Sequence, residues 1–423
     1  MQRRHFLQGA SAVGVLGLSA CATPSVPTKA RVVVVGGGYG GATAAKYVRL
    51  LSDHRIDVVL VEPNEAFVSC PISNLVLGGS RQLADITVPY SGLRRQGVTV
   101  VKDAARSIDT QRKVVTLSGG VTIGYDKLVV APGVELMSDR IEGLQAAHAS
   151  GAALHAWKAG AETAALRRQL EAMPDGGVYA LAIPEAPYRC PPGPYERACQ
   201  VAWYFKNAKP RSKVIVLDAN GDVTSKGALF KKVWSDLYPG IIEYRPQHKT
   251  TAIDARAGLL KFEVQEDLKA QVLNVLPPMR AGAIAVQAGL NNLADRRWCG
   301  VDYQTFESTV APDVHVVGDS IMLAPLMPKS AHMANSHAKV AAAAIVARLA
   351  GWEVNPAPML TNTCYSFVDD RQVVHVASVH EYVAAEKTFK AVAGAGGLSP
   401  GPTELEGVHA WSWARNIWAD SLG

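Results

Sequence analysis

The first third of the chain alternates between short apolar runs and one helical pattern. Residues 31–35 form a β-branched run that is typical of a buried strand in a parallel sheet. Residues 42–51 predict a helix with alanines, Tyr47 and Val48 available for packing, and residues 57–61 predict a second strand. The order strand, helix, strand predicts a βαβ unit.

Glycines at the end of the first predicted strand indicate a dinucleotide site. Gly36, Gly38 and Gly41 match the pattern G-x-G-x-x-G. The first glycine permits a tight turn, the second lets the backbone approach a pyrophosphate, and the third lets the helix pack on the strand. The helix N-terminus offers free N–H groups to the phosphates. Glu62, at the end of the second strand, is placed to hydrogen-bond ribose hydroxyls.

Two later strands indicate that the dinucleotide is FAD. Residues 125–133 predict a strand and a tight turn, and residues 314–319 predict a strand that ends on Gly-Asp. Flavoproteins with two dinucleotide-binding domains carry both features, and the aspartate contacts the ribityl chain. A helix predicted over 330–349 would stabilise negative charge on the reduced flavin with its N-terminus. The residues expected to contact FAD in these segments are Ala131, Gly133, Gly318 and Asp319.

The middle of the chain lacks a second glycine fingerprint. Residues 175–218 should hold the second dinucleotide domain, but the turn after its first strand contains Pro184 and Pro187. Prolines remove N–H donors and add bulk, so this turn is a poor cradle for a pyrophosphate. We therefore expect a domain with an NAD-like fold that does not bind NAD.

These elements predict an α/β flavoprotein with two Rossmann-type domains, like glutathione reductase, and a C-terminal α+β interface domain. The expected parts are a leader at 1–22, a discontinuous FAD domain at 30–145 and 256–350, an NAD-like domain at 146–255, and a third domain at 356–423.

Charge and the N-terminal residues bear on the partners and the location of the protein. The chain has 423 residues and a formal net charge of +6, without a Lys/Arg cluster dense enough to indicate nucleic acid. Arg3 and Arg4 open a short apolar stretch typical of a twin-arginine export signal, which predicts a periplasmic protein. Residues 18–21 resemble a lipoprotein box, so Cys21 is either lipid-modified or removed by ordinary cleavage. Only lipidation of Cys21 would attach the chain to a membrane.

The cysteines are the candidates for chemistry. Cys70 stands alone shortly after Glu62, so a local dithiol is excluded there, and it is either a buried thiol or a covalent flavin anchor. Cys190 comes just before a helix predicted from Tyr195, whose dipole would favour the thiolate. Glu196 lies within a turn and could move a proton. Cys364 meets Cys190 only if distant parts of the chain come together.

Several motifs resemble the flavoprotein subunit of flavocytochrome c–sulfide dehydrogenase along nearly the whole mature chain. The supporting stretches are residues 32–38, 41–47, 190–198, 327–330 and 362–366, and the last three are far more specific than the glycine pattern.

The resemblance implies a role for each matched residue. It implies that Cys70 links covalently to FAD, that Cys190 and Cys364 form a redox-active disulfide where sulfide arrives, and that Glu196 is an acid near it. Lys329, in the fourth motif, is assigned to the cofactor site. It further implies oxidation of sulfide to polysulfide or elemental sulfur, with electrons passed to a c-type cytochrome subunit that carries the haem. The resemblance also implies that residues 356–423 cover the flavin and contact this cytochrome subunit. We expect no metal site in the chain itself.

Departures from the family pattern leave substrate preference and partner open. They are Pro71-Ile72 after Cys70, Ser320-Ile321 after Gly-Asp, and Asp369-Asp370 after the Cys364 motif. Two alternatives therefore stand beside the cytochrome-linked enzyme. One is a sulfide:quinone oxidoreductase, which would need a membrane-inserting end such as the tryptophan-rich tail at 411–418. The other is a flavoprotein that binds and reactivates a sulfur-carrier protein.

Overall fold

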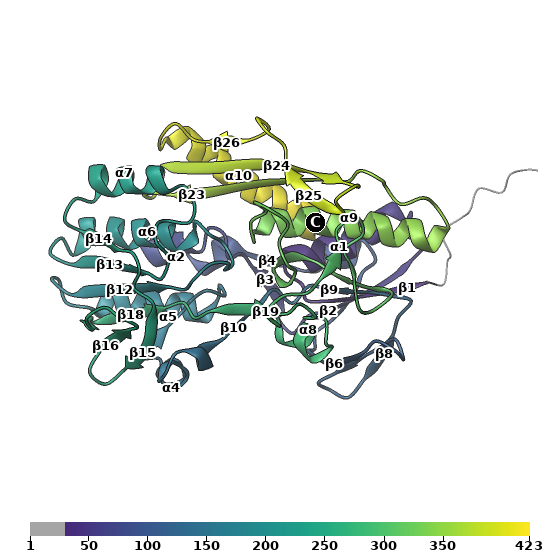
Figure 1. Ribbon diagram of the computed structural model, residues 1–423, viewed down its shortest axis with the longest axis horizontal. Coiled ribbons are helices and arrows are strands. Elements are labelled where there is room, and N and C mark those ends of the chain that lie inside the picture. The colour runs from purple at the N-terminus through teal and green to yellow at the C-terminus, as the bar shows by residue number, and fades with distance from the viewer. Residues whose placement is uncertain (1–29) are drawn as a thin grey trace, which may run out of the picture.

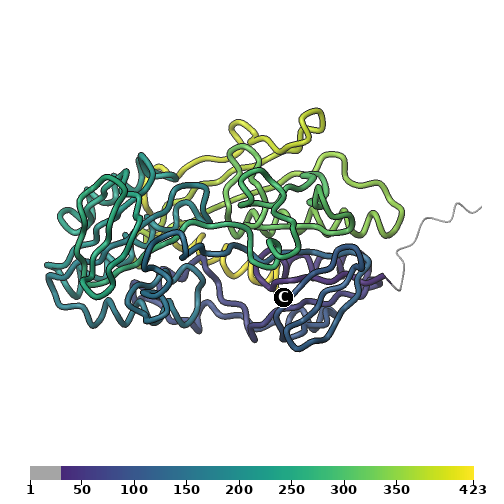
Figure 2. The backbone as a smooth tube through the Cα atoms, turned by 60° about the horizontal axis from the view of Figure 1, so that its bottom comes forward, coloured from purple at the N-terminus to yellow at the C-terminus, as the bar shows by residue number. Residues whose placement is uncertain are grey.

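In the computed structural model, residues 30–423 are described, so the predicted leader with Arg3, Arg4 and Cys21 lies outside the described residues. Two α/β domains stand side by side, and the two long C-terminal strands lie along one side of both (Figure 1). Figure 2 shows the middle domain, in teal, at the end of the molecule away from the N-terminal strand. The predicted fold class is confirmed.

The first domain is built on a seven-stranded sheet that begins with the predicted βαβ unit. Strand β1 (Arg31–Val35) pairs in parallel with β2 (Asp57–Val61) and β9 (Lys127–Val130), and its valines are buried. Parallel strands that are buried on both faces have continuous apolar sequences, and this is why residues 31–35 and 57–61 could be predicted as strands. The remaining strands of this sheet are β5 (Thr99–Val101), β20 (Val301–Asp302), β21 (Glu307–Ser308) and β22 (Val314–Val316).

Two helices pack together beside this sheet. Helix α1 (Tyr39–Leu51) connects β1 to β2, and α9 (Ala331–Ala350) is capped by the Ser330 hydroxyl, which accepts from the Met333 N–H. Smaller elements complete the domain: β3 (Ala66–Val68), α2 (Asn74–Gly78), η1 (Leu83–Ile86), β4 (Thr87–Pro89), α3 (Ser91–Arg95), β6 (Ala105–Asp109), β7 (Val114–Leu117), β8 (Thr122–Gly124), α8 (Ala283–Gln287) and η3 (Gly318–Ser320).

The middle domain has its own five-stranded parallel sheet. Its spatial order is β11 (Ala153–Leu154), β18 (Val272–Val275), β12 (Val178–Ile183), β13 (Lys213–Asp218) and β14 (Ile242–Arg245). Because β18 pairs with β12, this domain extends to residue 275, and the boundary predicted at 255 was too early. The intervening strands β15 (Thr250–Asp254), β16 (Leu259–Phe262) and β17 (Leu268–Lys269) form an antiparallel sheet that the sequence pattern did not assign to it.

Helices of the middle domain are α4 (Leu144–Ala149), α5 (Ala161–Ala172), α6 (Gly193–Ala208) and α7 (Gly227–Leu237). Strands β10 (Val134–Leu136) and β19 (Met279–Ala281) pair with each other where the chain passes between the two domains, and η2 (Ser138–Arg140) follows β10.

The C-terminal segment joins both domains. Strands β23 (Met359–Phe367) and β24 (Val373–Val383) pair in antiparallel register along their length, and β25 (Thr388–Ala391) and β26 (Gly397–Leu398) extend this sheet. Helix α10 (Glu404–Leu422) returns to α1, where the Thr43 hydroxyl donates to Ser421 at 2.9 Å. Among the described helices, none is long and apolar enough to cross a bilayer.

Candidate functional site

The turn between β1 and α1 has the shape of a dinucleotide cradle. Gly36 has a φ of +98°, and a Cβ there would lie 2.5 Å from the Ala131 carbonyl oxygen. At Gly41 a Cβ would lie 1.8 Å from the Gly36 oxygen, so this glycine lets helix α1 sit against the turn. A Cβ at Gly38 would meet nothing within 4 Å, because this residue borders a cavity. That open approach is what a pyrophosphate requires.

Glu62 fixes the cradle from the neighbouring strand. Its carboxylate accepts from the Gly37 N–H at 2.7 Å and from the Asn64 N–H at 2.8 Å. The Tyr90 hydroxyl donates to the Gly37 carbonyl at 3.0 Å. Glu62 is buried yet still lines the cavity, which leaves its oxygens able to accept from a sugar hydroxyl.

The opposite wall of the cavity comes from the two strands that indicated FAD. Ala131 and Gly133 follow β9, and Gly318 and Asp319 follow β22 in the short helix η3. The Asp319 Oδ1 atom is buried without a hydrogen-bond partner among the described residues, and burial raises the pKa of this carboxyl. A buried orphan oxygen needs a donor, and a ribityl hydroxyl supplies one. The cavity of about 630 Å³ therefore fits FAD.

Two residues assigned to the cofactor do not reach the cavity wall. Gly41 packs against the Gly36 turn and acts on the cradle only through the backbone. The Lys329 ammonium donates to the carbonyls of Asp319 and Ile321, at 2.9 and 2.7 Å. It also lies 3.5 Å from the centre of the Trp298 ring. Lys329 therefore holds the turn that presents Asp319, and its direct contact with the cofactor stays a prediction.

Cys70 lies on the cavity wall, in the loop between β3 and α2. Its sulfur accepts from the Ala159 N–H at 3.5 Å, so it faces a loop of the middle domain. This position fits a thiol beside the cofactor. Cys70 forms no disulfide with another cysteine among the described residues.

The structure brings Cys190 and Cys364 to the same cavity, although 174 positions separate them in the sequence. Cys190 has a φ of +60° and donates its N–H to the Lys329 carbonyl at 2.8 Å, so its backbone is held in a left-handed conformation. Cys364 lies on β23 opposite Val376. Both are free thiols in this structure.

The expected thiolate at Cys190 is not favoured here. Helix α6 begins at Gly193, earlier than the predicted Tyr195, but burial outweighs the helix end and raises the pKa of the Cys190 thiol. Burial likewise raises the pKa of the Cys364 thiol. Both sulfurs thus favour an uncharged state.

Glu196 lines the cavity near the two sulfurs. Its carboxylate accepts from the Phe367 N–H at 3.1 Å and from the Asn74 side-chain amide at 3.2 Å. Burial raises the pKa of Glu196 to about 7, partly offset by these hydrogen bonds. A carboxyl that titrates near neutral pH can both give and take a proton.

The structure adds Lys226, which sequence reasoning missed. This side chain is 5% exposed and its ammonium reaches the strand that carries Cys364. The surrounding sequence, Thr-Ser-Lys-Gly, has no pattern that distinguishes it from a surface turn. Strands β23 and β24 bury it, and their oxygens accept from its ammonium.

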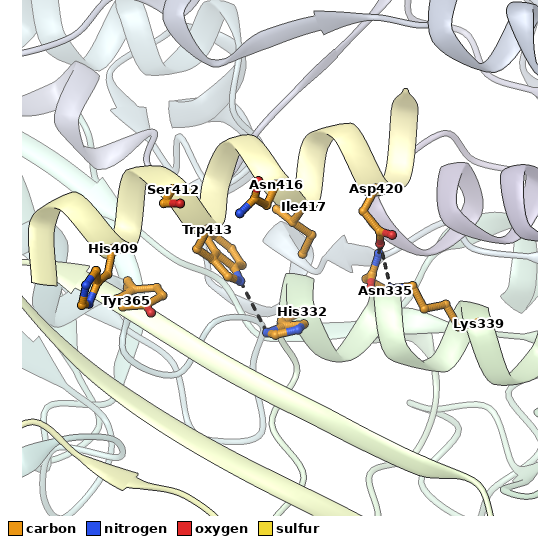
Figure 3. Close-up of a pocket in the computed structure, with 10 residues that line it drawn as sticks. All are labelled: His332, Asn335, Lys339, Tyr365, His409, Ser412, Trp413, Asn416, Ile417 and Asp420. Carbon is orange, nitrogen blue, oxygen red and sulfur yellow. Dashed lines mark hydrogen bonds and ion pairs between the residues drawn. The ribbon is translucent and has the colours of Figure 1, made fainter.

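One wall of the cavity is thin and faces a surface groove. His332, Tyr365 and Trp413 line both the cavity and the groove, which has a volume of about 450 Å³. The Trp413 indole N–H points to His332 Nδ1 at 3.4 Å from the other side of the groove (Figure 3). Aromatic side chains therefore connect the cavity with the outer face at α9 and α10.

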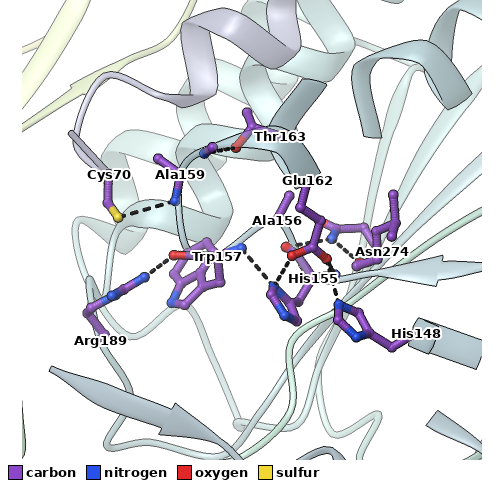
Figure 4. A network of polar contacts seen from close by, with 12 residues as sticks. Cys70, His148, His155, Ala156, Trp157, Ala159, Glu162, Thr163, Arg189 and Asn274 are labelled. Atoms are coloured by element: carbon purple, nitrogen blue, oxygen red, sulfur yellow. Dashed lines mark hydrogen bonds and ion pairs between the residues drawn. The ribbon is translucent and has the colours of Figure 1, made fainter. Parts of the chain in front are cut away.

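A cluster of potential metal ligands, His148, His155 and Glu162, lies to one side of the contact between Cys70 and Ala159 (Figure 4). His148 Nε2 and His155 Nδ1 lie 3.0 and 2.9 Å from separate oxygens of Glu162. The two imidazole rings are stacked, 4.5 Å between centres and 15° between planes, and Glu162 also accepts from the His155 backbone N–H at 2.8 Å. The cluster is better described as a clasp that fixes residues 155–160, which line the cavity from Trp157 to Gly160.

The fold and the cavity together define an FAD-dependent oxidoreductase. The pyridine nucleotide-disulphide oxidoreductase family model matches residues 30–168. The sulfide:quinone oxidoreductase structure from Aquifex aeolicus superposes with a TM-score of 0.74 and 17% identity, over 93% of this chain and 91% of that one. At this identity, the likeness establishes the fold alone.

Two further family models match later parts of the chain. The model for the central part of the sulfide dehydrogenase [flavocytochrome c] flavoprotein chain matches residues 163–277, and the flavocytochrome c sulphide dehydrogenase flavin-binding model matches residues 356–422. The flavoprotein chain of this enzyme from Chlorobaculum thiosulfatiphilum is 67% identical over 46 residues, which is 94% of that sequence and 11% of this chain. The chain belongs to the family of flavocytochrome c sulfide dehydrogenase flavoprotein chains.

Mitochondrial sulfide:quinone oxidoreductases are more distant relatives. The Dictyostelium discoideum protein is 24% identical over 304 residues, 69% of this chain and 65% of its own length. The family places the chain among FAD-dependent oxidoreductases that oxidise sulfide, and this part of the prediction is confirmed.

Proposed function

We propose that this chain oxidises sulfide at a disulfide formed by Cys190 and Cys364 and delivers the electrons through FAD to a c-type cytochrome. The observation that carries the proposal is the convergence of both cysteines and Glu196 on the cavity that begins at the glycine cradle. FAD, when bound, accepts an electron pair and releases electrons singly. Gly36, Gly38 and Asp319 would hold it.

The chemistry of this chain's own residues begins with the disulfide. HS⁻ attacks one sulfur, a new S–S bond forms, and the old S–S bond breaks with its electron pair on the departing thiolate. The product is a cysteine persulfide and a cysteine thiolate. Glu196, with its pKa near 7, exchanges the proton that accompanies sulfide binding and release.

Substitution of each cysteine tests the role of the disulfide. Cys190→Ser and Cys364→Ser should retain FAD but lose bleaching of the flavin by sulfide at least 1,000-fold. Cys199→Ser is the matched control, because this thiol lies on α6 and contacts the Trp234 indole instead of the cavity. Wild-type bleaching rates in either cavity variant would overturn the disulfide mechanism.

We propose further that Cys70 carries FAD through a thioether to the 8α-methyl group. Support comes from the position of its sulfur on the cavity wall, away from the two other cavity cysteines in sequence. Acid denaturation should leave the flavin on a peptide that contains Cys70. Flavin released entirely into the supernatant would remove this assignment and leave the cysteine as a packing residue.

The groove at α9 and α10 is the proposed face for the cytochrome. His332, Tyr365 and Trp413 separate it from the cavity, so an acceptor haem seated there would be one side-chain layer from the cofactor. The quinone-linked alternative needs a tail that enters the membrane. However, the Trp418 side chain is buried and its indole N–H donates to the Tyr39 hydroxyl at 3.0 Å. Rapid reduction of a c-type cytochrome without detergent supports the proposal, and reduction of a short-chain quinone alone overturns it.

The proposed location is the periplasm, reached by the twin-arginine route. The support is the leader that begins at Arg3 and Arg4, and a lipid on Cys21 stays the alternative to simple cleavage. Intact mass of the exported protein distinguishes the two. A chain that stays uncleaved in the cytoplasm would contradict export.

A further inference from the structure

Lys226 is a charged side chain in a place where charge is costly. It precedes α7, has a left-handed backbone with a φ of +57°, and is 5% exposed. Lysine is almost never this buried unless it is paired with an opposite charge. The left-handed backbone and the burial together indicate that the surrounding structure holds Lys226 in this conformation, as is common at functional sites.

The hydrogen-bond partners of the Lys226 ammonium are three neutral oxygens. The Nζ atom donates to the Cys364 carbonyl at 2.8 Å, the Ser366 hydroxyl at 2.7 Å and the Val374 carbonyl at 3.3 Å. These bonds tie the middle domain, which carries Cys190, to strands β23 and β24. They use the three N–H groups of the ammonium, and no ion pair joins it to a carboxylate among the described residues.

The ammonium lies beside the backbone of Cys364 and interacts electrostatically with both sulfurs and with Glu196. Burial lowers the pKa of Lys226 to about 8, and the groups that act in the opposite direction are Cys364 first, then Glu196, Cys190 and Glu406. In turn, Lys226 lowers the pKa of Cys364 and of Glu196 against the effect of their burial. Lys226 is thus electrostatically coupled to each chemical group of the proposed disulfide site.

We propose that Lys226 is a positioning residue that supplies the positive charge for the thiolate formed when the Cys190–Cys364 disulfide opens. The inference rests on the proposed function for the disulfide itself. When HS⁻ attacks, a new S–S bond forms to one cysteine and the other cysteine departs with the electron pair and one negative charge. The ammonium keeps its proton. Its positive charge, which has no ion-pair partner while the disulfide is closed, is then balanced by the negative charge of the new thiolate.

Stabilisation of a thiolate requires a charged side chain at position 226, because a neutral hydrogen-bond donor would not supply the positive charge. A buried charge without an ion-pair partner destabilises the resting protein. That cost is offset only in a state that places a negative charge nearby. The buried ammonium of Lys226 therefore favours the opened disulfide over the closed one. Sulfide oxidation requires the disulfide to open.

The test measures the thiolates directly and needs neither sulfide nor an electron acceptor. The holoprotein is reduced with a dithiol, and alkylation of Cys364 and Cys190 by iodoacetamide is followed against pH by peptide mass spectrometry. Lys226→Met should slow alkylation of at least one of these thiols tenfold or more at pH 8, and shift its midpoint upward by at least one pH unit. Lys226→Arg, which retains the charge, should restore most of the rate.

Two controls separate charge from structure. Lys206→Met removes an ammonium on the same domain whose Nζ donates to the Leu237 carbonyl at 3.1 Å, and it should not change the rate. Ser366→Ala removes one partner of Lys226 but keeps the charge, and should change the rate less than threefold. If Lys226→Met does not fold, Lys226→Gln, which keeps an N–H donor, carries the same test.

An unchanged alkylation profile in a folded neutral variant would overturn the proposal, as would an equal effect of Ser366→Ala. Failure of the proposed function looks different. In that case the Cys190→Ser protein would still turn over sulfide, whereas the alkylation profile would still depend on Lys226.

Discussion

The glycines of the cradle make different contacts, and substituting them one at a time separates folding from cofactor binding. In Gly41→Ala the new Cβ would lie 1.8 Å from the Gly36 oxygen, so the start of α1 must retreat by about 1.6 Å to reach an ordinary contact near 3.4 Å. The helix packs on β1 and α9, and such overpacking costs about 3 kcal/mol, the upper end of the usual range. At about 2 °C per kcal/mol in a chain of this size, Tm should fall by about 6 °C.

Gly38→Ala is the matched control. Its φ of −71° suits alanine and its Cβ meets no protein atom within 4 Å, so the loss of stability should stay near the ~1 kcal/mol of a poorer helix cap. The methyl group does, however, occupy the approach of the pyrophosphate, and flavin content should fall at least tenfold. Differential scanning fluorimetry and absorbance near 450 nm measure the two effects. The reasoning is refuted if Gly41→Ala keeps its Tm within 2 °C or Gly38→Ala takes up flavin normally.

Three other outcomes are expected. Cys70→Ser should bind flavin that acid releases completely, and flavin that stays attached to the variant would assign the anchor elsewhere. Burial lowers the pKa of His337 to about 3, and a depressed histidine pKa contributes stability above pH 6.5 that is lost as the pH falls toward 3, by about 5 kcal/mol in total. Tm of His337→Asn should therefore fall less steeply than that of the wild type between pH 6.5 and 4, and parallel slopes would contradict this. Trp413→Ala should slow cytochrome reduction at least threefold without slowing flavin bleaching by sulfide, whereas Trp411→Ala, whose ring stacks on Arg81 instead, should affect neither.

The parts of the fold that the sequence predicted are those set by local chemistry. Strands β1 and β2 occur at the expected residues, and α9 is displaced by a single residue, because buried parallel strands and a serine cap leave signals in contiguous sequence. The end of the middle domain was misplaced because β18 is added to the sheet only after an antiparallel insertion. Short strands that complete a sheet late carry little periodicity of their own.

The site follows the same division. The glycines and cysteines stand in recognisable motifs, so their positions could be predicted. Lys226 and the orphan oxygen of Asp319 acquire their properties only from burial by distant segments. Lys329 shows the converse, since its motif was recognised but its ammonium bonds to carbonyls of the Asp319 turn. A motif identifies a residue, whereas its contacts depend on tertiary packing.

The return of α10 to α1 has a consequence for biosynthesis. The Thr43 hydroxyl bonds to Ser421 and Lys46 bonds to the Ala419 carbonyl, so the helix that follows the cradle is braced by residues more than 370 positions later in the sequence. Trp413 and Cys364, which line the cavity, also come from the late segment 359–422. The cofactor chamber therefore stays incomplete until this segment has been synthesised and has docked. FAD has an open route into the nascent protein before that point, and its cover is added only afterwards.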